Sequence, residues 1–151
     1  DQVLATLQRT GANPLRLKLE LTEGMLVSNV EDVIAKMVRL KSAGVGFSLD
    51  DFGTGYSSLN YLKHLPVDTV KIDKSFVRDM LSDPDDLAIV SGVIGLATAF
   101  GRNIVAEGVE TVQHAERLLE MGCYVVQGYG IARPMPAPTV IDWVSQWKGF
   151  K

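Results

Sequence analysis

The feature that most constrains the fold is a regular alternation of strand patterns and helix patterns along the chain. Five segments have the alternating or apolar character of strands, and a helix pattern follows each one: Leu15–Thr22, Gly46–Asp51, Thr69–Asp73, Asn103–Val109 and Cys123–Gly128. Strand–helix repeats of this kind favour a parallel sheet with helices packed outside it. No linker or low-complexity segment interrupts the pattern, so the sequence predicts one α/β domain.

The expected helices end at glycine or proline in most cases, and one has a serine as its cap. They are Gln2–Thr10, Val30–Ala43, Ser57–Leu65, Asp85–Phe100, Thr111–Met121 and Thr139–Trp147, with a further helical turn near Phe76. Because Trp143 and Trp147 are four residues apart, we expect them to dock together against the body of the domain. We expect His64 and His114 on the surface, and Cys123 as a small buried residue.

Polar residues occupy the inward face of every expected strand near its carboxyl end. Strands of a doubly wound sheet would be apolar on both faces, so this pattern favours the interior of a TIM-like (β/α) barrel. The residues at the strand ends are Glu20, Asp50, Lys71, Glu107 and Gln127. A complete barrel takes about 250 residues and eight strands. Five units therefore predict the carboxyl-terminal portion of an incomplete barrel, with roughly three strands missing.

Composition excludes several classes of partner. The formal net charge is -3 and no basic run stands out, so a groove that binds DNA or RNA through phosphate charge is not expected. No apolar run is long enough to span a bilayer, and Cys123 is the only cysteine. These features make cytoplasmic residence the default expectation, with no membrane contact in this segment. The chain starts at Asp1 beside an expected helix, which is typical of the later part of a longer protein.

The segment Ser48–Tyr56 contains two adjacent carboxylates, Asp50 and Asp51, followed by a Gly-Thr-Gly turn. In mid-strand the two side chains would point to opposite faces, and one would be buried at a cost of several kcal/mol. At a strand end, where the backbone turns, both can converge on a cation. Asp50 can then bridge two metal ions while Asp51 serves one. A solvated acidic turn is the simpler alternative.

The other polar strand ends each have a structural and a functional interpretation. Glu20 is an interior ion-pair partner or a metal ligand, and Lys71 is a charge balancer or a cation that orients water or a phosphate oxygen. Asp73 can pair with Lys71, while Glu23 either anchors a loop or is solvated. Glu107 is the better ligand or base of its pair. Two further residues have supporting roles: Glu110 as a partner or helix N-terminal carboxylate, and Gln127 as a hydrogen-bonding amide.

An acidic mouth of this kind repels phosphate unless divalent cations occupy it. Two Mg²⁺ or Mn²⁺ ions held by carboxylate oxygens would turn it into a site that activates water and stabilises a phosphoryl transition state. No Cys/His set suited to zinc is present. A glycosidase also needs two carboxylates, but it would leave the additional acids and Lys71 unexplained.

Five motifs in this order closely resemble the later motifs of the EAL domain family, from about Leu15 to Trp143. They are Glu20-Leu21-Thr22-Glu23, Asp50-Asp51-Phe52-Gly53-Thr54-Gly55, Lys71-Ile72-Asp73, Ala106-Glu107-Gly108-Val109-Glu110 and Gln127-Gly128-Tyr129. The resemblance implies a TIM-like barrel that hydrolyses cyclic di-GMP to linear pGpG with Mg²⁺ or Mn²⁺. Five ordered motifs are far more specific than any one of them.

The resemblance also implies a role for each residue. Glu20 and Asp50 would bind one metal ion, and Asp50, Asp51 and Glu107 would serve the second ion and its water. Lys71 would hold the attacking water, with Glu107 assisting as base. The supporting residues would be Glu23, which anchors the loop Phe52–Ser58, Gln127, and the loop Tyr129–Pro136 with Arg133 and Pro134 at the guanine pocket.

The chain departs from the family pattern at its start. The Glu-Ala-Leu motif and the asparagine of the next strand, which also bind metal in the family, are absent. We therefore expect a truncated catalytic domain, weakly active or inactive alone, from a parent linked to GGDEF or sensory domains. The alternatives are a receptor that binds cyclic di-GMP without cleaving it and a dimerisation module. Exposed sheet edges predict homodimers or other self-association.

Overall fold

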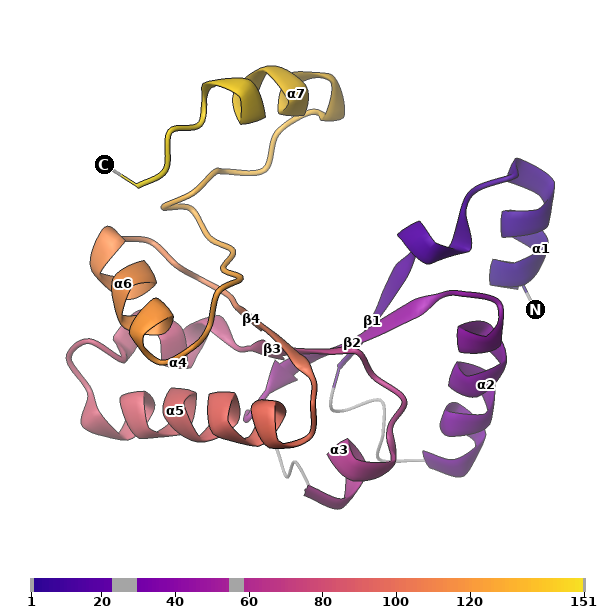
Figure 1. The fold of residues 1–151 in the computed structure, drawn as a ribbon, viewed down its shortest axis with the longest axis horizontal. Helices are drawn as coiled ribbons and strands as arrows, with labels where there is room; N and C mark the ends of the chain where they lie inside the picture. Colours follow the sequence, from indigo (N-terminus) through magenta and orange to yellow (C-terminus); the bar gives the residue numbers. More distant parts are fainter. Residues whose placement is uncertain (1, 23–29, 55–58, 151) are drawn as a thin grey trace.

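The computed structural model describes residues 2–22, 30–54 and 59–150, and it shows an α/β fold built on one parallel sheet (Figure 1). Within these residues the sheet has four strands in the order β1-β2-β3-β4. Their bounds are β1 Lys18–Thr22, β2 Gly46–Phe52, β3 Thr69–Ile72 and β4 Asn103–Ala106. All three pairings are parallel, with in-register partners such as Leu19 with Phe47 and Val70 with Ile104. The expected fold class is therefore confirmed, and the sheet is consistent with part of a TIM-like barrel.

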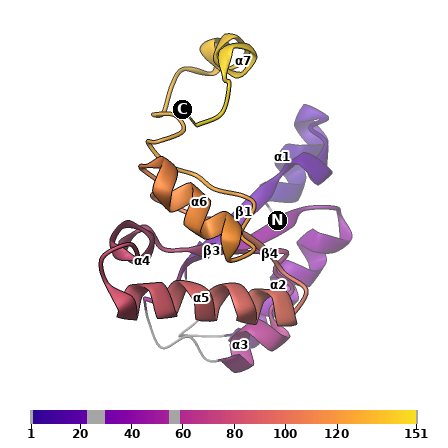
Figure 2. The ribbon, with the colours of Figure 1, turned by 60° about the vertical axis from the view of Figure 1, so that its left-hand side comes forward.

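Helices connect successive strands and cover one face of the sheet. In chain order they are α1 Gln2–Thr10, the 3₁₀ turn η1 Pro14–Arg16, α2 Val30–Ser42, α3 Leu59–His64, α4 Lys74–Asp79, α5 Pro84–Ala99, α6 Val112–Glu120 and α7 Ala137–Gln146. Figures 1 and 2 show α2, α3 and α5 on the same side of the sheet. No helix in the described ranges is long and apolar enough to cross a membrane.

The core lies between the sheet and these helices. Phe47 and Leu49 from β2, with Val70 and Ile72 from β3, are buried on the helix side. The long helix α5 contributes four buried residues, Val90, Val93, Ile94 and Ala97. Burial of each large aliphatic side chain stabilises the fold by about 1.5–3 kcal/mol. The opposite face of the sheet carries buried polar side chains instead, namely Ser48, Thr69 and Lys71.

Side-chain caps fix where several helices begin. The carboxylates of Asp73 and Asp83 accept hydrogen bonds from the backbone N–H groups at the starts of α4 and α5. Thr111 caps α6, and it also contacts the Nδ1 of His114 at 2.7 Å. The expectation that His114 lies on the surface is wrong, because its ring is buried and its Nε2 lies 3.1 Å from the carbonyl of Arg78 at the end of α4. This histidine therefore joins α4 to α6.

Three of the expected strands differ from the structure by more than one residue. The strand expected at Asn103–Val109 ends at Ala106, so Glu107 follows β4. The segment Leu15–Thr22 begins with η1, because Pro14 favours a helical start and Asn13 caps it by accepting a hydrogen bond from Leu15 N at 3.0 Å. The expected fifth strand, Cys123–Gly128, is wrong as a strand. It forms a single parallel bridge, Ala106 with Val126, so this segment runs beside β4 without a continuous ladder.

The carboxyl-terminal helix α7 lies apart from the sheet (Figure 2). Trp143 and Trp147 stack on each other with ring centroids 5.1 Å apart, as their spacing predicts. The expected docking against the body is wrong, because α7 buries none of its residues. Cys123 is buried as expected, and its thiol donates to the carbonyl of Val125.

Candidate active site at the carboxyl ends of the strands

The side chains expected at the strand ends meet around one lysine. The Nζ of Lys71, on β3, lies 3.0 Å from Glu20 Oε1, 3.0 Å from Asp50 Oδ1 and 2.7 Å from Glu107 Oε1. These carboxylates come from β1, from β2 and from the residue after β4. One lysine on β3 therefore contacts a side chain at the end of each of the other three strands. The structure thus brings together four of the five predicted strand-end residues.

The carboxylates keep Lys71 charged. Burial alone would lower the pKa of this lysine, but hydrogen bonds to Glu107, Asp50 and Glu20 outweigh burial and raise the pKa above its ordinary value. Only 9% of the side chain is exposed. Lys71 is therefore a fixed hydrogen-bond donor at neutral pH and does not serve as a base.

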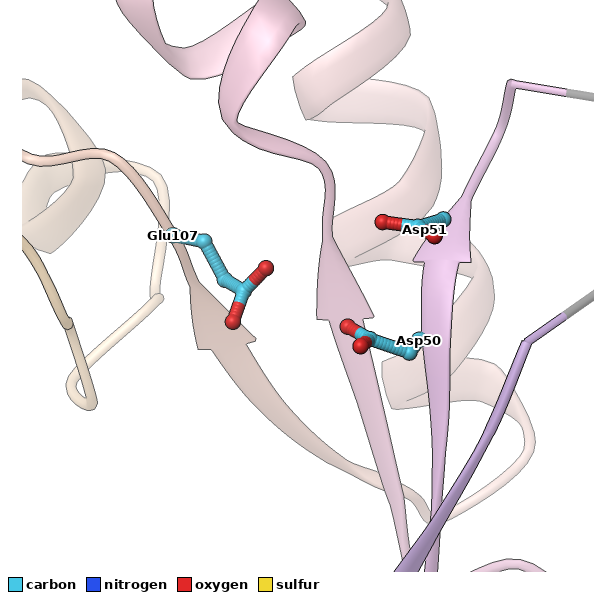
Figure 3. A group of neighbouring side chains, drawn as sticks. All are labelled: Asp50, Asp51 and Glu107. Atoms are coloured by element: carbon cyan, nitrogen blue, oxygen red, sulfur yellow. The ribbon is translucent and has the colours of Figure 1, made fainter.

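A local irregularity of β2 explains how two adjacent carboxylates reach the same site. Side chains alternate between faces along a regular strand, which would separate Asp50 from Asp51. Here the register of β2 with β3 shifts between Leu49 and Phe52, and Asp51 has a φ of 54° in the left-handed region. As Figure 3 shows, Asp50 and Asp51 project from the end of β2 towards the side from which Glu107 approaches. The expectation that both carboxylates converge where the backbone turns is confirmed.

Asp51 also interacts with Asp73. Burial, the neighbouring charges of Asp50 and Asp73, and a hydrogen bond with Asp73 together raise the pKa of Asp51. For Asp73, burial opposes ionisation, but hydrogen bonds from the hydroxyl and backbone N–H of Ser75 outweigh it and lower the pKa. The expected pairing of Asp73 with Lys71 is wrong: Asp73 follows the last residue of β3 and its carboxylate caps α4.

The donor set fits a hard divalent cation. One carboxylate oxygen each from Asp50, Asp51 and Glu107 can be chosen so that the three lie within 4.8 Å of one another. Asp50 Oδ1 is buried, and apart from Lys71 Nζ at 3.0 Å it has no hydrogen-bond partner within the described ranges. Oxygen ligands at this spacing suit Mg²⁺ or Mn²⁺. Glu20 contacts Lys71 but stands outside this compact group, and its side chain is 53% exposed.

A cavity of about 540 Å³ adjoins Glu107. Its walls are Lys74, Arg78, Glu107, Gly108, Glu110, Gln127, Gly128, Tyr129 and Pro134, which we call the Gly108–Gly128 pocket. Two glycines allow the close backbone approaches around it. A Cβ at Gly108 would lie 2.6 Å from Lys74 Cβ, and one at Gly128 would lie 2.1 Å from the carbonyl oxygen of Val109. A larger cavity of about 690 Å³, beside Trp143 and Trp147, is not lined by the carboxylates around Lys71.

The pocket contains some of the predicted ligand-binding residues and some that the sequence did not indicate. Gln127 and Pro134, predicted to bind the ligand, line it together with Glu110, for which a supporting role is predicted. Arg133 lies over the ring of Tyr129, 4.7 Å from its centroid. Lys74 and Arg78 were not predicted, although their spacing of four residues on the helix after Asp73 is a signal for one shared face. The loop anchor Glu23 and residues 55–58 of the loop Phe52–Ser58 fall outside the described ranges.

Comparisons with known proteins identify the family of this chain. Residues 1–134 match the family model described as the EAL domain. The bifunctional diguanylate cyclase/cyclic di-GMP phosphodiesterase MucR of Pseudomonas aeruginosa is 43% identical over 145 residues, which make up 96% of this chain and 21% of that protein. The chain thus spans about a fifth of the length of this curated relative.

Two solved structures extend the comparison to three dimensions. The PaMucR phosphodiesterase in complex with c-di-GMP is similar with a TM-score of 0.88 at 44% identity, and the match covers 93% of this chain and 57% of that one. The manganese/cy-diGMP complex of Klebsiella pneumoniae BlrP1 gives a TM-score of 0.80 at 32% identity, with coverage of 88% and 34%.

Proposed function

This chain belongs to the EAL domain family, and we propose that it forms part of a metal-dependent phosphodiesterase that hydrolyses cyclic di-GMP to linear pGpG. The observation that carries the proposal is the convergence of Asp50, Asp51 and Glu107 beside the buried Lys71. Every metal-binding residue implied by the family motifs in this chain is a carboxylate that faces this site. A receptor that has lost catalysis has no need to keep all of them.

The proposed metal site divides the carboxylates between two ions. Glu20 and Asp50 would hold one ion, and Asp50, Asp51 and Glu107 would hold the other. When bound, Mg²⁺ or Mn²⁺ would offset the acidic charge, polarise the phosphodiester and lower the pKa of water. The buried Asp50 Oδ1 has no hydrogen-bond partner other than Lys71 Nζ within the described ranges, so it can also bind a cation, which supports the bridging position.

The protein side chains have separate tasks in the proposed reaction. Lys71, kept charged by its neighbours, donates a hydrogen bond that orients the attacking water. Glu107, 2.7 Å from Lys71 Nζ, accepts the proton of that water. The water oxygen forms a bond to phosphorus, and the P–O3′ bond breaks. The leaving 3′ oxygen takes up a proton, so the product has one 5′-phosphate and one free 3′-hydroxyl.

We propose that the Gly108–Gly128 pocket receives one guanine base of the substrate. The pocket shares Glu107 with the metal site, which places a bound base next to the scissile phosphodiester. Gln127, Tyr129 and Pro134 line it, and the guanidinium of Arg133 lies over the ring of Tyr129. Gln127 supplies an amide without adding charge, and Glu110 supplies a carboxylate that can accept hydrogen bonds from a guanine edge.

The proposal also covers the setting of this domain. We propose that the chain supplies the carboxyl-terminal part of a catalytic barrel, whose other strands complete the metal site, and that the protein acts as a homodimer in the cytoplasm. The solved PaMucR chain, of which 57% is matched, supports the first point. The name of the relative MucR, a bifunctional diguanylate cyclase/phosphodiesterase, supports linkage to a GGDEF domain. The single buried Cys123 is compatible with a reducing compartment.

The test is hydrolysis of cyclic di-GMP by this chain and by the chain extended with the preceding barrel strands. Both are incubated with Mn²⁺, with and without a chelator, and the products are separated chromatographically. We expect chelator-sensitive pGpG from the extended protein and little or none from the chain alone. If the extended protein binds cyclic di-GMP tightly but forms no product, the phosphodiesterase assignment is refuted and the alternative, a non-catalytic cyclic di-GMP receptor, is favoured. Equal rates for both would refute the need for additional strands.

A further inference from the structure

Ser48 carries a buried hydroxyl that the fold does not explain. It lies in the middle of β2 with 1% of its surface exposed, and its Oγ has no hydrogen-bond partner among the described residues. A buried polar group without a partner destabilises the folded protein. Alanine would fill nearly the same space without that cost. The small size of serine therefore does not account for the hydroxyl.

The strand register places this hydroxyl below the metal site. Ser48 pairs with Glu20 on β1 and with Thr69 on β3. Side chains that are aligned across a parallel sheet point to the same face, and residues two apart on one strand do so as well. Ser48 therefore shares its face with Glu20, Thr69 and Asp50. Thr69 Oγ1 accepts a hydrogen bond from Lys18 Nζ at 3.0 Å, and it makes no hydrogen bond with Ser48 Oγ.

A second buried oxygen on this face can accept a further hydrogen bond. Asp50 Oδ1, two residues along β2 from Ser48, has no hydrogen-bond partner other than Lys71 Nζ at 3.0 Å within the described part of the chain. Residues two apart on a strand are separated by about 6.6 Å along the strand. Two hydrogen bonds of about 2.8 Å each, made through one water molecule, span nearly that distance. The chemistry is complementary, because the serine hydroxyl can donate to the water and the water can donate to the carboxylate.

We propose that Ser48 is a positioning residue for the metal site, and that its hydroxyl holds a buried water molecule that donates a hydrogen bond to Asp50. Ser48 Oγ and Asp50 Oδ1 give this water two polar partners, which is the lower end of what a buried water needs. This hydrogen bond would fix the orientation of the carboxylate that is proposed to bind the cations. The inference rests on the proposed function for the identity of those cations.

The loss of such a supporting group lowers metal affinity more than it disturbs the fold. Outer groups that orient metal ligands typically change affinity by about 10–100-fold when they are removed. We therefore expect Ser48→Ala to raise the Kd for Mn²⁺ at least about 10-fold. Ser48→Thr keeps the hydroxyl and should stay within about 3-fold of the wild type. The matched control is Ser42→Ala, which removes an exposed hydroxyl that donates to the carbonyl of Val38.

The experiment is calorimetric titration of Mn²⁺ into the complete protein and these variants, without substrate, after circular dichroism has shown that each is folded. An unchanged Kd for Ser48→Ala would overturn the inference, as would equal losses in the alanine and threonine variants. If Ser48→Ala does not fold, a high-resolution crystal structure of the wild type decides. Density for a water between Ser48 Oγ and Asp50 supports the inference, and its absence overturns it. If the protein binds Mn²⁺ but does not hydrolyse cyclic di-GMP, the proposed function is refuted and the inference about Ser48 is not.

Discussion

Replacement of Lys71 by methionine is the most informative perturbation of this site. Methionine keeps the length and packing of the side chain but removes the charge that three carboxylates surround. Lys71 is 9% exposed and its ion-pair distances are 2.7–3.0 Å, so the variant leaves several carboxylates close together without a cation. We expect a clear loss of stability in the metal-free protein.

The size of that loss follows from the exposure of the partners. Removal of one member of a buried ion pair costs about 3–5 kcal/mol. The side chain of Glu20 is 53% exposed and contributes little, as exposed ion pairs do. Asp50 and Glu107 are 20% and 16% exposed and are screened only in part. We therefore expect Lys71→Met to lower the free energy of unfolding by about 2–4 kcal/mol.

Urea unfolding of the complete protein in the presence of a chelator measures this loss. The matched control is Lys36→Met, because Lys36 forms an exposed pair with Asp32 at 2.5 Å and should cost less than about 0.5 kcal/mol. Saturating Mn²⁺ should return part of the stability of the Lys71 variant, since a cation again neutralises the carboxylates. Equal effects of the two substitutions, or a more stable Lys71→Met, would refute the argument that this lysine holds the cluster together.

Three further predictions concern residues around the site. Because the pKa of Asp51 is raised in the folded protein, its contribution to stability is fully present below its ordinary pKa and is lost as pH rises through the raised value. With a chelator present, the free energy of unfolding in urea should therefore fall between pH 4 and pH 7 more for the wild type than for Asp51→Asn. If the free energies of both proteins change with pH in the same way, the prediction is contradicted. His114→Ala should lower the free energy of unfolding by about 1–3 kcal/mol, because it leaves the carbonyl of Arg78 on α4 without this partner. As the control, substitution of the exposed His64 by alanine should change the free energy of unfolding by less than about 0.5 kcal/mol. Gly108→Ala should lower the melting temperature, because Gly108 has a φ of 73° and the new methyl group would collide with Lys74 on α4. As the control, Gly92→Ala should be neutral or stabilising, since its methyl group meets nothing within 4 Å. An unchanged melting temperature for Gly108→Ala would refute the close approach.

The sequence predicts the strand–helix order and the contents of the site because both depend on local patterns. Alternating faces identify Lys71 and Asp50 as inward residues, and parallel strands bring their carboxyl ends to one edge whatever the loop details are. The interpretation of Lys71 as a charge balancer beside acidic strand ends rests on these patterns, whereas its partners Glu20 and Glu107 are identified only by the structure. Helix caps such as Thr111 are equally local.

The remaining features depend on contacts between distant segments. The left-handed conformation of Asp51 has no marker in a non-glycine residue, and it appears only in the shifted register with β3. His114 lies on a helix that is polar in sequence, and it is buried because α4 packs against it. The segment expected as the fifth strand has the apolar character of a strand, but among the described residues it forms only the bridge from Val126 to Ala106.

The measurement that tests the central claim most directly is the rate of cyclic di-GMP hydrolysis by the complete protein and by its Asp50→Ala variant. Each is assayed after chelation and again after Mn²⁺ is restored. The account predicts pGpG from the wild type only when Mn²⁺ is present, and none from Asp50→Ala at any Mn²⁺ concentration, because the variant lacks the carboxylate assigned to both ions. Metal-dependent hydrolysis by Asp50→Ala at a rate near that of the wild type would contradict the assignment of the metal site.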